Sequence, residues 1–176
     1  MANSIASVIV PAGKYTLRYA ESLRKDIKPE WMARFASPGG QVIKSNHPTF
    51  VYGHLSLYSS RIMGLIGKPE GITAKPEGWD ALFKAGVECQ DDPNGTIYPS
   101  HEAVMKHFFE GFPVALAAAE STDDSVYMKP NPAEGRFKEM APTVGAAVSF
   151  IMGAHHATHL GQLSAWRRMM GLPAAN

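Results

Sequence analysis

The chain has 176 residues, of which 45% are hydrophobic and 19% charged, and its formal net charge is +1 with neutral histidines. This length and composition are typical of one globular domain with a substantial core, so we expect a single domain over residues 1–176. The basic residues are scattered and form no run longer than a pair such as Arg167-Arg168. Proteins that bind nucleic acids or anionic membranes need a basic face, so we expect neither as a partner.

The cysteine content and the apolar segments predict a cytoplasmic protein. Cys89 is the only cysteine, so no disulfide can form within the chain. Residues 1–15 lack a basic segment before their apolar stretch, unlike a secretory signal peptide. The longest mostly apolar run, residues 144–154, is too short to cross a bilayer.

The spacing of apolar residues predicts four long helices. Ser100 and Thr143 are expected N-caps of the third and fourth, and Asn46 of the second, where Pro48 follows in the first turn. The expected bounds are approximately 14–27, 47–66, 101–120 and 144–170.

The second and third helices are separated by a long, irregular segment rich in Gly, Pro, Asn and Asp, residues 69–99, in which a short helix is expected at 76–85. A connection of this length has more than a linking role in most domains, so we expect it to wall a pocket. The expected fold is therefore all-α: a four-helix bundle with a long irregular connection between helices 2 and 3.

Two histidines on the expected fourth helix carry the strongest chemical signal. His155 and His159 are four residues apart, so their side chains project from one face of the helix, one turn apart. That face continues through Ile151, Gln162 and Trp166, which places the histidines where core residues should point. Two imidazoles inside a bundle are costly unless they bind something, and a metal ion can be gripped at this spacing.

His54 is the best candidate for a third ligand, because it lies beside apolar residues of the second helix. Three histidines leave coordination positions open, and imidazole suits zinc, nickel, copper or iron. Hydrogen-bonded core histidines are the alternative explanation. His156 points about one hundred degrees away from His155, so we expect it to pack or to face solvent rather than to bind the metal.

These residues carry a resemblance to a known family. Residues 155–173, HHATHLGQLSAWRRMMGLP, resemble the C-terminal signature of the DinB-like (DinB/YfiT) metalloprotein superfamily: His, three residues, His, one residue, Gly-Gln. Residues 46–55, NHPTFVYGHL, are similar to the part of the second helix that holds the family's first metal histidine. The resemblance implies that His54, His155 and His159 are the metal triad, with zinc or nickel as the expected ion. Members of the family are often homodimers.

The resemblance also implies an activity. Related proteins use low-molecular-weight thiols such as bacillithiol, mycothiol or glutathione in S-transfer or isomerisation, so we expect a small-molecule substrate and a thiol cofactor. Gln162 is a candidate cofactor-binding residue that can orient a ligand but cannot act as a base. No catalytic residue is assigned, because no general base accompanies the triad. A metal-dependent hydrolase and a non-catalytic stress-response protein with a structural metal remain alternatives.

Overall fold

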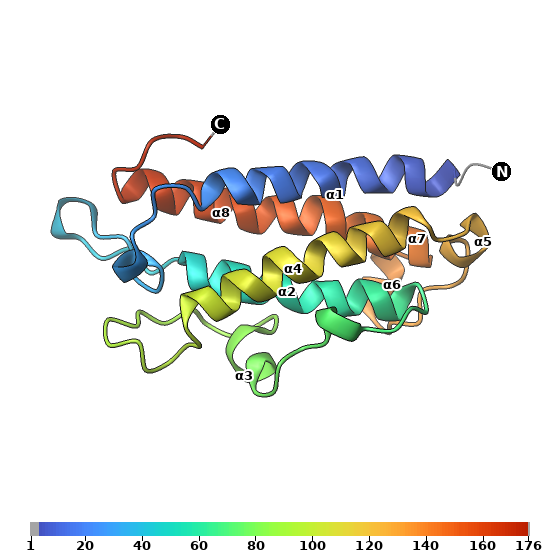
Figure 1. The fold of residues 1–176 in the computed structure, drawn as a ribbon, viewed down its shortest axis with the longest axis horizontal. Helices are drawn as coiled ribbons and strands as arrows, with labels where there is room; N and C mark the ends of the chain where they lie inside the picture. The colour runs from blue at the N-terminus through green and yellow to red at the C-terminus, as the bar shows by residue number, and fades with distance from the viewer. Residues whose placement is uncertain (1–3, 176) are drawn as a thin grey trace.

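The computed structural model describes residues 4–175, and the prediction of an all-α fold is confirmed for them. Within this range there is no strand, and the pairing is limited to two isolated bridges, Ala36 with Ile43 and Pro130 with Thr143. Long helical segments lie side by side along the long axis of the molecule (Figure 1). They are α1 (Ser4–Leu23), α2 (Pro48–Leu65), α4 (His101–Glu120), and the continuous run of α7 (Val144–Phe150), the π-helical turn η4 (Ile151–His155) and α8 (His156–Met169).

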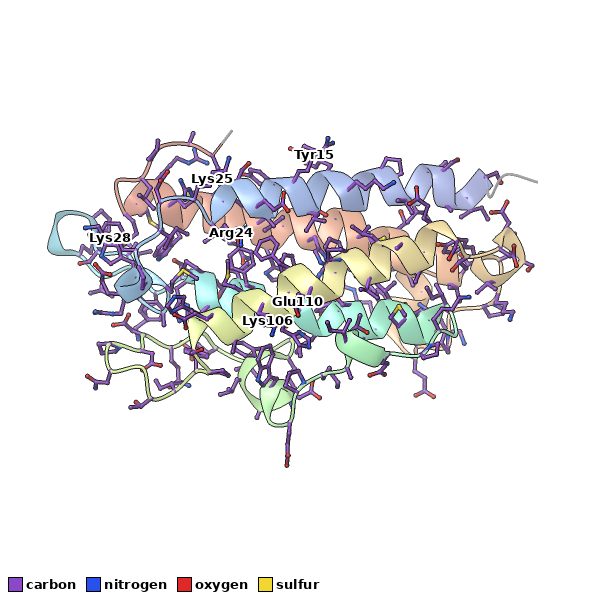
Figure 2. The ribbon with its side chains drawn as sticks, in the orientation of Figure 1. Tyr15, Arg24, Lys25, Lys28, Lys106 and Glu110 are labelled. Carbon is purple, nitrogen blue, oxygen red and sulfur yellow. The ribbon has the colours of Figure 1, made fainter. Side chains whose placement is uncertain are left out.

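The long helices bury one shared core. Helix α2 packs chiefly on α4, while α1 packs on α4 and on η4 and α8. Aromatic rings contribute much of the interior, and Tyr52, Phe108 and Phe112 have no exposed surface. Charged side chains such as Lys106 and Glu110 lie on the solvent-exposed side of α4 (Figure 2). The amphipathic pattern therefore sets which face of each helix points inward.

Helix α1 begins at Ser4 and ends at Leu23, so the expected bounds of 14–27 were wrong at both ends. Pro11 lies inside the helix, although a proline removes one backbone hydrogen bond there. Residues on both sides of Pro11 are buried in the core, among them Ile9 and Val10 before it and Ala20 after it. We infer that this burial outweighs the lost hydrogen bond.

The caps of the later helices were predicted correctly in two of three cases. Ser100 accepts a hydrogen bond from the backbone N–H of Ala103, and Thr143 accepts one from Ala146. Helix α2 is capped by His47 and not by Asn46, because Nδ1 of His47 accepts a hydrogen bond from the N–H of Phe50. The side chain of Asn46 is thereby left for another contact, described below.

The connection between α2 and α4 is long and mostly irregular, as expected, and it packs against both helices. It contains one 3₁₀ turn, η3 (Gly71–Thr73), and the short helix α3 (Trp79–Phe83), which is narrower than the expected 76–85. Elsewhere, further short helical pieces occur: η1 (Pro29–Trp31), η2 (Pro38–Gly40), α5 (Asp124–Tyr127) and α6 (Arg136–Met140). Among the described residues, no helix combines the length and apolarity that crossing a bilayer requires.

Candidate metal centre

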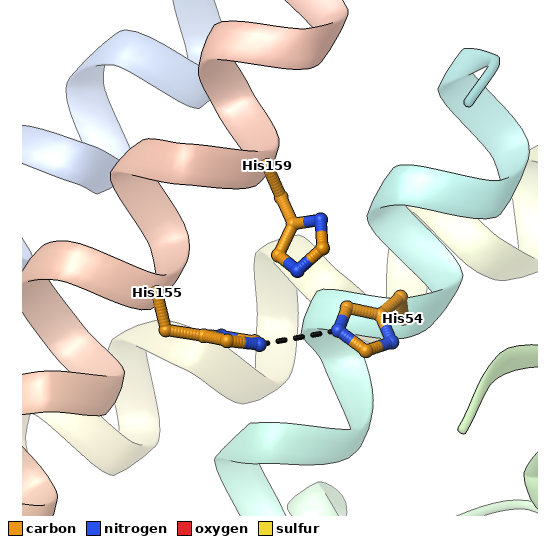
Figure 3. A group of neighbouring side chains, drawn as sticks. All are labelled: His54, His155 and His159. Atoms are coloured by element: carbon orange, nitrogen blue, oxygen red, sulfur yellow. Dashed lines mark hydrogen bonds between the residues drawn. The ribbon is translucent and has the colours of Figure 1, made fainter. Parts of the chain in front are cut away.

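Three histidines from two long helical segments converge at one point (Figure 3). His54 is on α2, His155 ends the π-helical turn η4, and His159 is one turn further on in α8. One ring nitrogen from each residue lies within 4.8 Å of the others, and His54 is only 4% exposed. The structure therefore brings together the three residues that the spacing predicted, in a group that can hold a metal ion.

A backbone carbonyl from the irregular connection orients His54. Nδ1 of His54 donates a hydrogen bond to the carbonyl oxygen of Phe83, at 2.6 Å. Phe83 is the last residue of α3 and has no exposed surface, so this acceptor is held firmly. With the proton on Nδ1, the lone pair of the ring is on Nε2, which faces the other histidines.

A chain of two amides orients His159. Nδ1 of His159 donates to Oε1 of Gln162, at 3.0 Å, and the same oxygen accepts a hydrogen bond from Nδ2 of Asn46, at 2.8 Å. The lone pair of His159 is therefore also on Nε2. Gln162 is exposed, not inward-facing as its position in the predicted stripe implied, and its contact is with the ring of His159. Asn46 was interpreted from the sequence as a helix cap, so this contact was missed.

The third histidine makes the closest approach. Nε2 of His155 lies 3.2 Å from Nε2 of His54 (Figure 3). Two nitrogen lone pairs repel at that distance, so a proton or a cation must lie between them. The buried Nδ1 of His155 has no hydrogen-bond partner within residues 4–175. The donor set fits a transition-metal ion, because all three Nε2 atoms face one centre and imidazole is a ligand for such ions.

Burial keeps all three rings neutral. It lowers the pKa of His54 to about 4, despite the opposing effect of the Phe83 carbonyl. Burial is also the main reason why the pKa of His155 falls to about 2, with smaller contributions from the neighbouring histidines and Arg61. The pKa of His159 is lowered by burial too. The lone pairs are therefore available for metal binding at neutral pH.

His156 does not join the group, in agreement with the prediction. Its ring is fully buried and stacks on Phe112, with centroids 4.4 Å apart. Its Nδ1 donates to the carbonyl oxygen of Ile151, which also accepts the backbone N–H of His156 in the π-helical turn. The fourth helix was expected to be regular throughout, and this wider turn was missed. Such turns are frequent at functional sites, and here one ends at His155, one turn before His159.

Tyr58 was not singled out from the sequence, although it lies four residues after His54 on the same face of α2. Its ring centroid is 4.0 Å from that of His155 and 5.1 Å from that of His54. Burial raises the pKa of its hydroxyl group, while the nearby charge of Arg61 opposes this. Tyr58 thus forms one wall of the centre and remains a neutral phenol at pH 7.

No protein-family model and no curated protein matches the chain. The resemblance to the DinB-like superfamily therefore stays a prediction that depends on the motif residues.

Proposed function

We propose that this protein binds one divalent transition-metal ion through His54, His155 and His159 and that it is a metal-dependent enzyme. The convergence of three neutral imidazoles, two of them oriented by Nδ1 hydrogen bonds, carries the proposal. Hydrogen bonds of this kind fix the ring orientation of metal-binding histidines in many proteins. Zinc or nickel is the proposed ion, since nitrogen ligands suit both.

We further propose a four-helix bundle of the DinB-like type. The histidines lie on the second and fourth of the long helical segments, in the order that the family signature implies. The segment from His155 to Gln162 carries the expected His, three residues, His, one residue, Gly-Gln. The long connection between α2 and α4 is compatible with this arrangement, because it packs outside the helices.

The proposed activity is thiol-dependent S-transfer or isomerisation of a small molecule. No Asp, Glu or Cys of the described residues joins the three histidines. Sites with three protein ligands keep a position for water or substrate, whereas structural sites close it. A bound divalent ion supplies Lewis-acid chemistry that favours the thiolate form of a thiol. Gln162 and Phe83 hold the ligand rings in place, and Tyr58 shields one side of the centre from water.

The same observations leave two other functions to be tested. A metal-dependent hydrolase would use the open position for water. A structural ion would tie α2 to α8 without chemistry. The thiol experiment below separates these functions.

Metal binding is tested first, by titrating metal-free protein with zinc, nickel and cobalt. We expect one ion per chain, and affinity lower by more than about 100-fold after His54→Ala, His155→Ala or His159→Ala, since each removes a ligand. His101→Ala is the matched control, because His101 lies at the start of α4, outside the group. Unchanged affinity in all three ligand variants would contradict the proposed site.

The activity is tested with cobalt-substituted protein, whose visible spectrum reports its ligands. Bacillithiol, mycothiol, glutathione and a simple dithiol are added in turn, and a generic electrophile is then supplied. We expect a sulfur-to-metal charge-transfer band and turnover that is absent in His155→Ala. If no thiol changes the spectrum, the transferase proposal fails, and ester or amide hydrolysis is assayed next. Loss of thermal stability on metal removal, without either activity, would indicate a structural ion.

A further inference from the structure

A cleft of about 660 Å³ runs beside the metal centre. One wall is the C-terminal half of α2, with Tyr58 and Arg61, and the opposite wall comes from the irregular connection, with Glu70, Lys75 and Lys84. The connection was expected to wall the pocket of the metal position, and in the structure it walls this neighbouring cleft. The three histidines themselves do not line this cleft, so it is a neighbouring site that needs its own explanation.

The cleft and the metal centre share one face of α2. His54, Tyr58 and Arg61 follow at spacings of four and three, so they lie on the same side of the helix. The ring of Tyr58 touches His155 on one side and lines the cleft on the other. The charge of Arg61 contributes, after burial and the neighbouring histidines, to the lowered pKa of His155. A small molecule in the cleft therefore lies one side chain away from the ligand histidines.

The guanidinium group of Arg61 is held without an anionic partner. Its central carbon lies 4.7 Å from the ring centroid of Phe137 and 5.8 Å from that of Tyr58. Contacts with two aromatic rings restrict this exposed side chain and leave its N–H groups for hydrogen bonds. No carboxylate of residues 4–175 forms an ion pair with it. A planar group of this kind matches a carboxylate through two parallel hydrogen bonds.

The other charges of the cleft favour an anion as well. Lys75 and Asp80 form an ion pair with each other, so they contribute no net charge. Arg61, Lys84 and Glu70 remain, and together they are positive. The net charge of the cleft is small, so selectivity for a carboxylate must come from the guanidinium group of Arg61.

We propose that this cleft binds the carboxylate of a small organic substrate through Arg61, while the other end of the molecule passes Tyr58 toward the metal centre. The carboxylate site does not depend on the proposed function, whereas the placement of the reactive end does. Arg61 is then a specificity-determining residue, and the ligand class is a carboxylic acid.

The test compares two thiols with the same four-carbon chain, one ending in a carboxylate and the other in a neutral hydroxyl group. Binding of 4-mercaptobutyrate and of 4-mercaptobutan-1-ol to cobalt-substituted protein is followed through the visible spectrum. We expect the acid to bind at least about tenfold more tightly than the alcohol, because a charge-assisted bidentate contact is added. In Arg61→Gln this preference should disappear, while the affinity for the alcohol stays the same. Arg61→Lys should keep part of the preference for the acid, since lysine retains the positive charge but lacks the two parallel N–H donors of arginine.

Arg18→Gln is the matched control, because Arg18 is an exposed arginine of α1 away from the cleft. It should leave the preference for the acid unchanged. Equal binding of acid and alcohol, or a preference that persists in Arg61→Gln, would overturn the proposal.

A second measurement separates failure of the metal chemistry from failure of the cleft. If neither thiol perturbs the spectrum, metal-free protein is examined by saturation-transfer NMR with 4-phenylbutyrate and its neutral amide. Arg61-dependent binding of the acid alone would support the cleft, even though the thiol proposal had failed. Absence of binding, or equal binding of both compounds, would refute the carboxylate site.

Discussion

The hydrogen-bond partner of one ring nitrogen decides what the other nitrogen of a histidine can do. In His54 and His159, Nδ1 donates to an oxygen, so Nε2 keeps its lone pair for a metal. The two acceptors differ in how firmly they are held. Phe83 is buried, whereas Gln162 is exposed and is held by a hydrogen bond from Asn46. The side-chain acceptor is therefore the one that a single substitution can remove.

Replacement of Gln162 by leucine should weaken metal binding by about 10–100-fold, the range for partners of ligand histidines. His159 keeps its position but loses its hydrogen-bond acceptor. That acceptor fixes the orientation of the ring and holds the proton on Nδ1. Competition with a chelator measures the affinity. Gln41→Leu is the control, since Gln41 is exposed and lies outside the centre. An affinity that is unchanged in Gln162→Leu would show that the amide has no such role.

Helix α2 carries His54 and packs against α3. Two glycines of α2, Gly53 and Gly64, show how closely the two helices pack. A Cβ atom at Gly53 would clash with the ring of Phe83, whereas one at Gly64 would meet nothing within 4 Å. Phe83 is also the residue whose carbonyl orients His54. The absence of a side chain at Gly53 thus lets α3 approach the metal centre.

Gly53→Ala should lower the free energy of unfolding by about 1–3 kcal/mol, as overpacking of a core does. It should also weaken metal binding, because Phe83 must shift. Gly64→Ala is matched to it in chemistry and helix, and it should raise the stability by up to about 1 kcal/mol through helix propensity. Chemical denaturation of metal-free protein measures both effects. Equal stability changes in the two variants would disprove the close packing of α3 on α2.

At the scale of the whole molecule, buried neutral histidines couple folding to pH. His47, which caps α2 and lies outside the centre, has no exposed surface, and burial lowers its pKa from 6.5 to about 4, against the opposing effects of the Gln90 carbonyl, Asp91 and Asp92. Between these values the unfolded chain binds a proton that the folded protein does not. This stabilisation is present above pH 6.5 and is lost as the pH falls toward 4.

In metal-free protein, His47 alone should account for up to about 3 kcal/mol of the stability lost on acidification. His47→Gln should lower the stability at pH 7 through the lost contacts, yet flatten its dependence on pH between 6.5 and 4. Gln41→Ala, which replaces an exposed residue with no titratable group, should leave the slope unchanged. Unfolding curves across this pH range measure it. A slope in His47→Gln as steep as in the parent protein would contradict this account.

Local patterns in the sequence were enough to predict the all-α fold and the three histidines of the candidate metal centre. Helical spacing relates His155 to His159, and the Ser100 and Thr143 caps depend on residues three positions away. Contacts within one helical turn are determined by residues that are close in the chain, so they can be predicted from the sequence. The inward position of His54 followed from the apolar residues beside it.

Only the tertiary structure decided the features that depend on distant residues. The start of α1 depends on burial of Ile9 and Val10 against other helices, which overrides the effect of Pro11. The carbonyl of Phe83, the contact of Asn46 with Gln162, and the cleft at Arg61 join segments that are far apart in the chain. No local pattern encodes these contacts, because they arise from packing of whole elements, and they determine how the ligand rings are oriented and what can approach them.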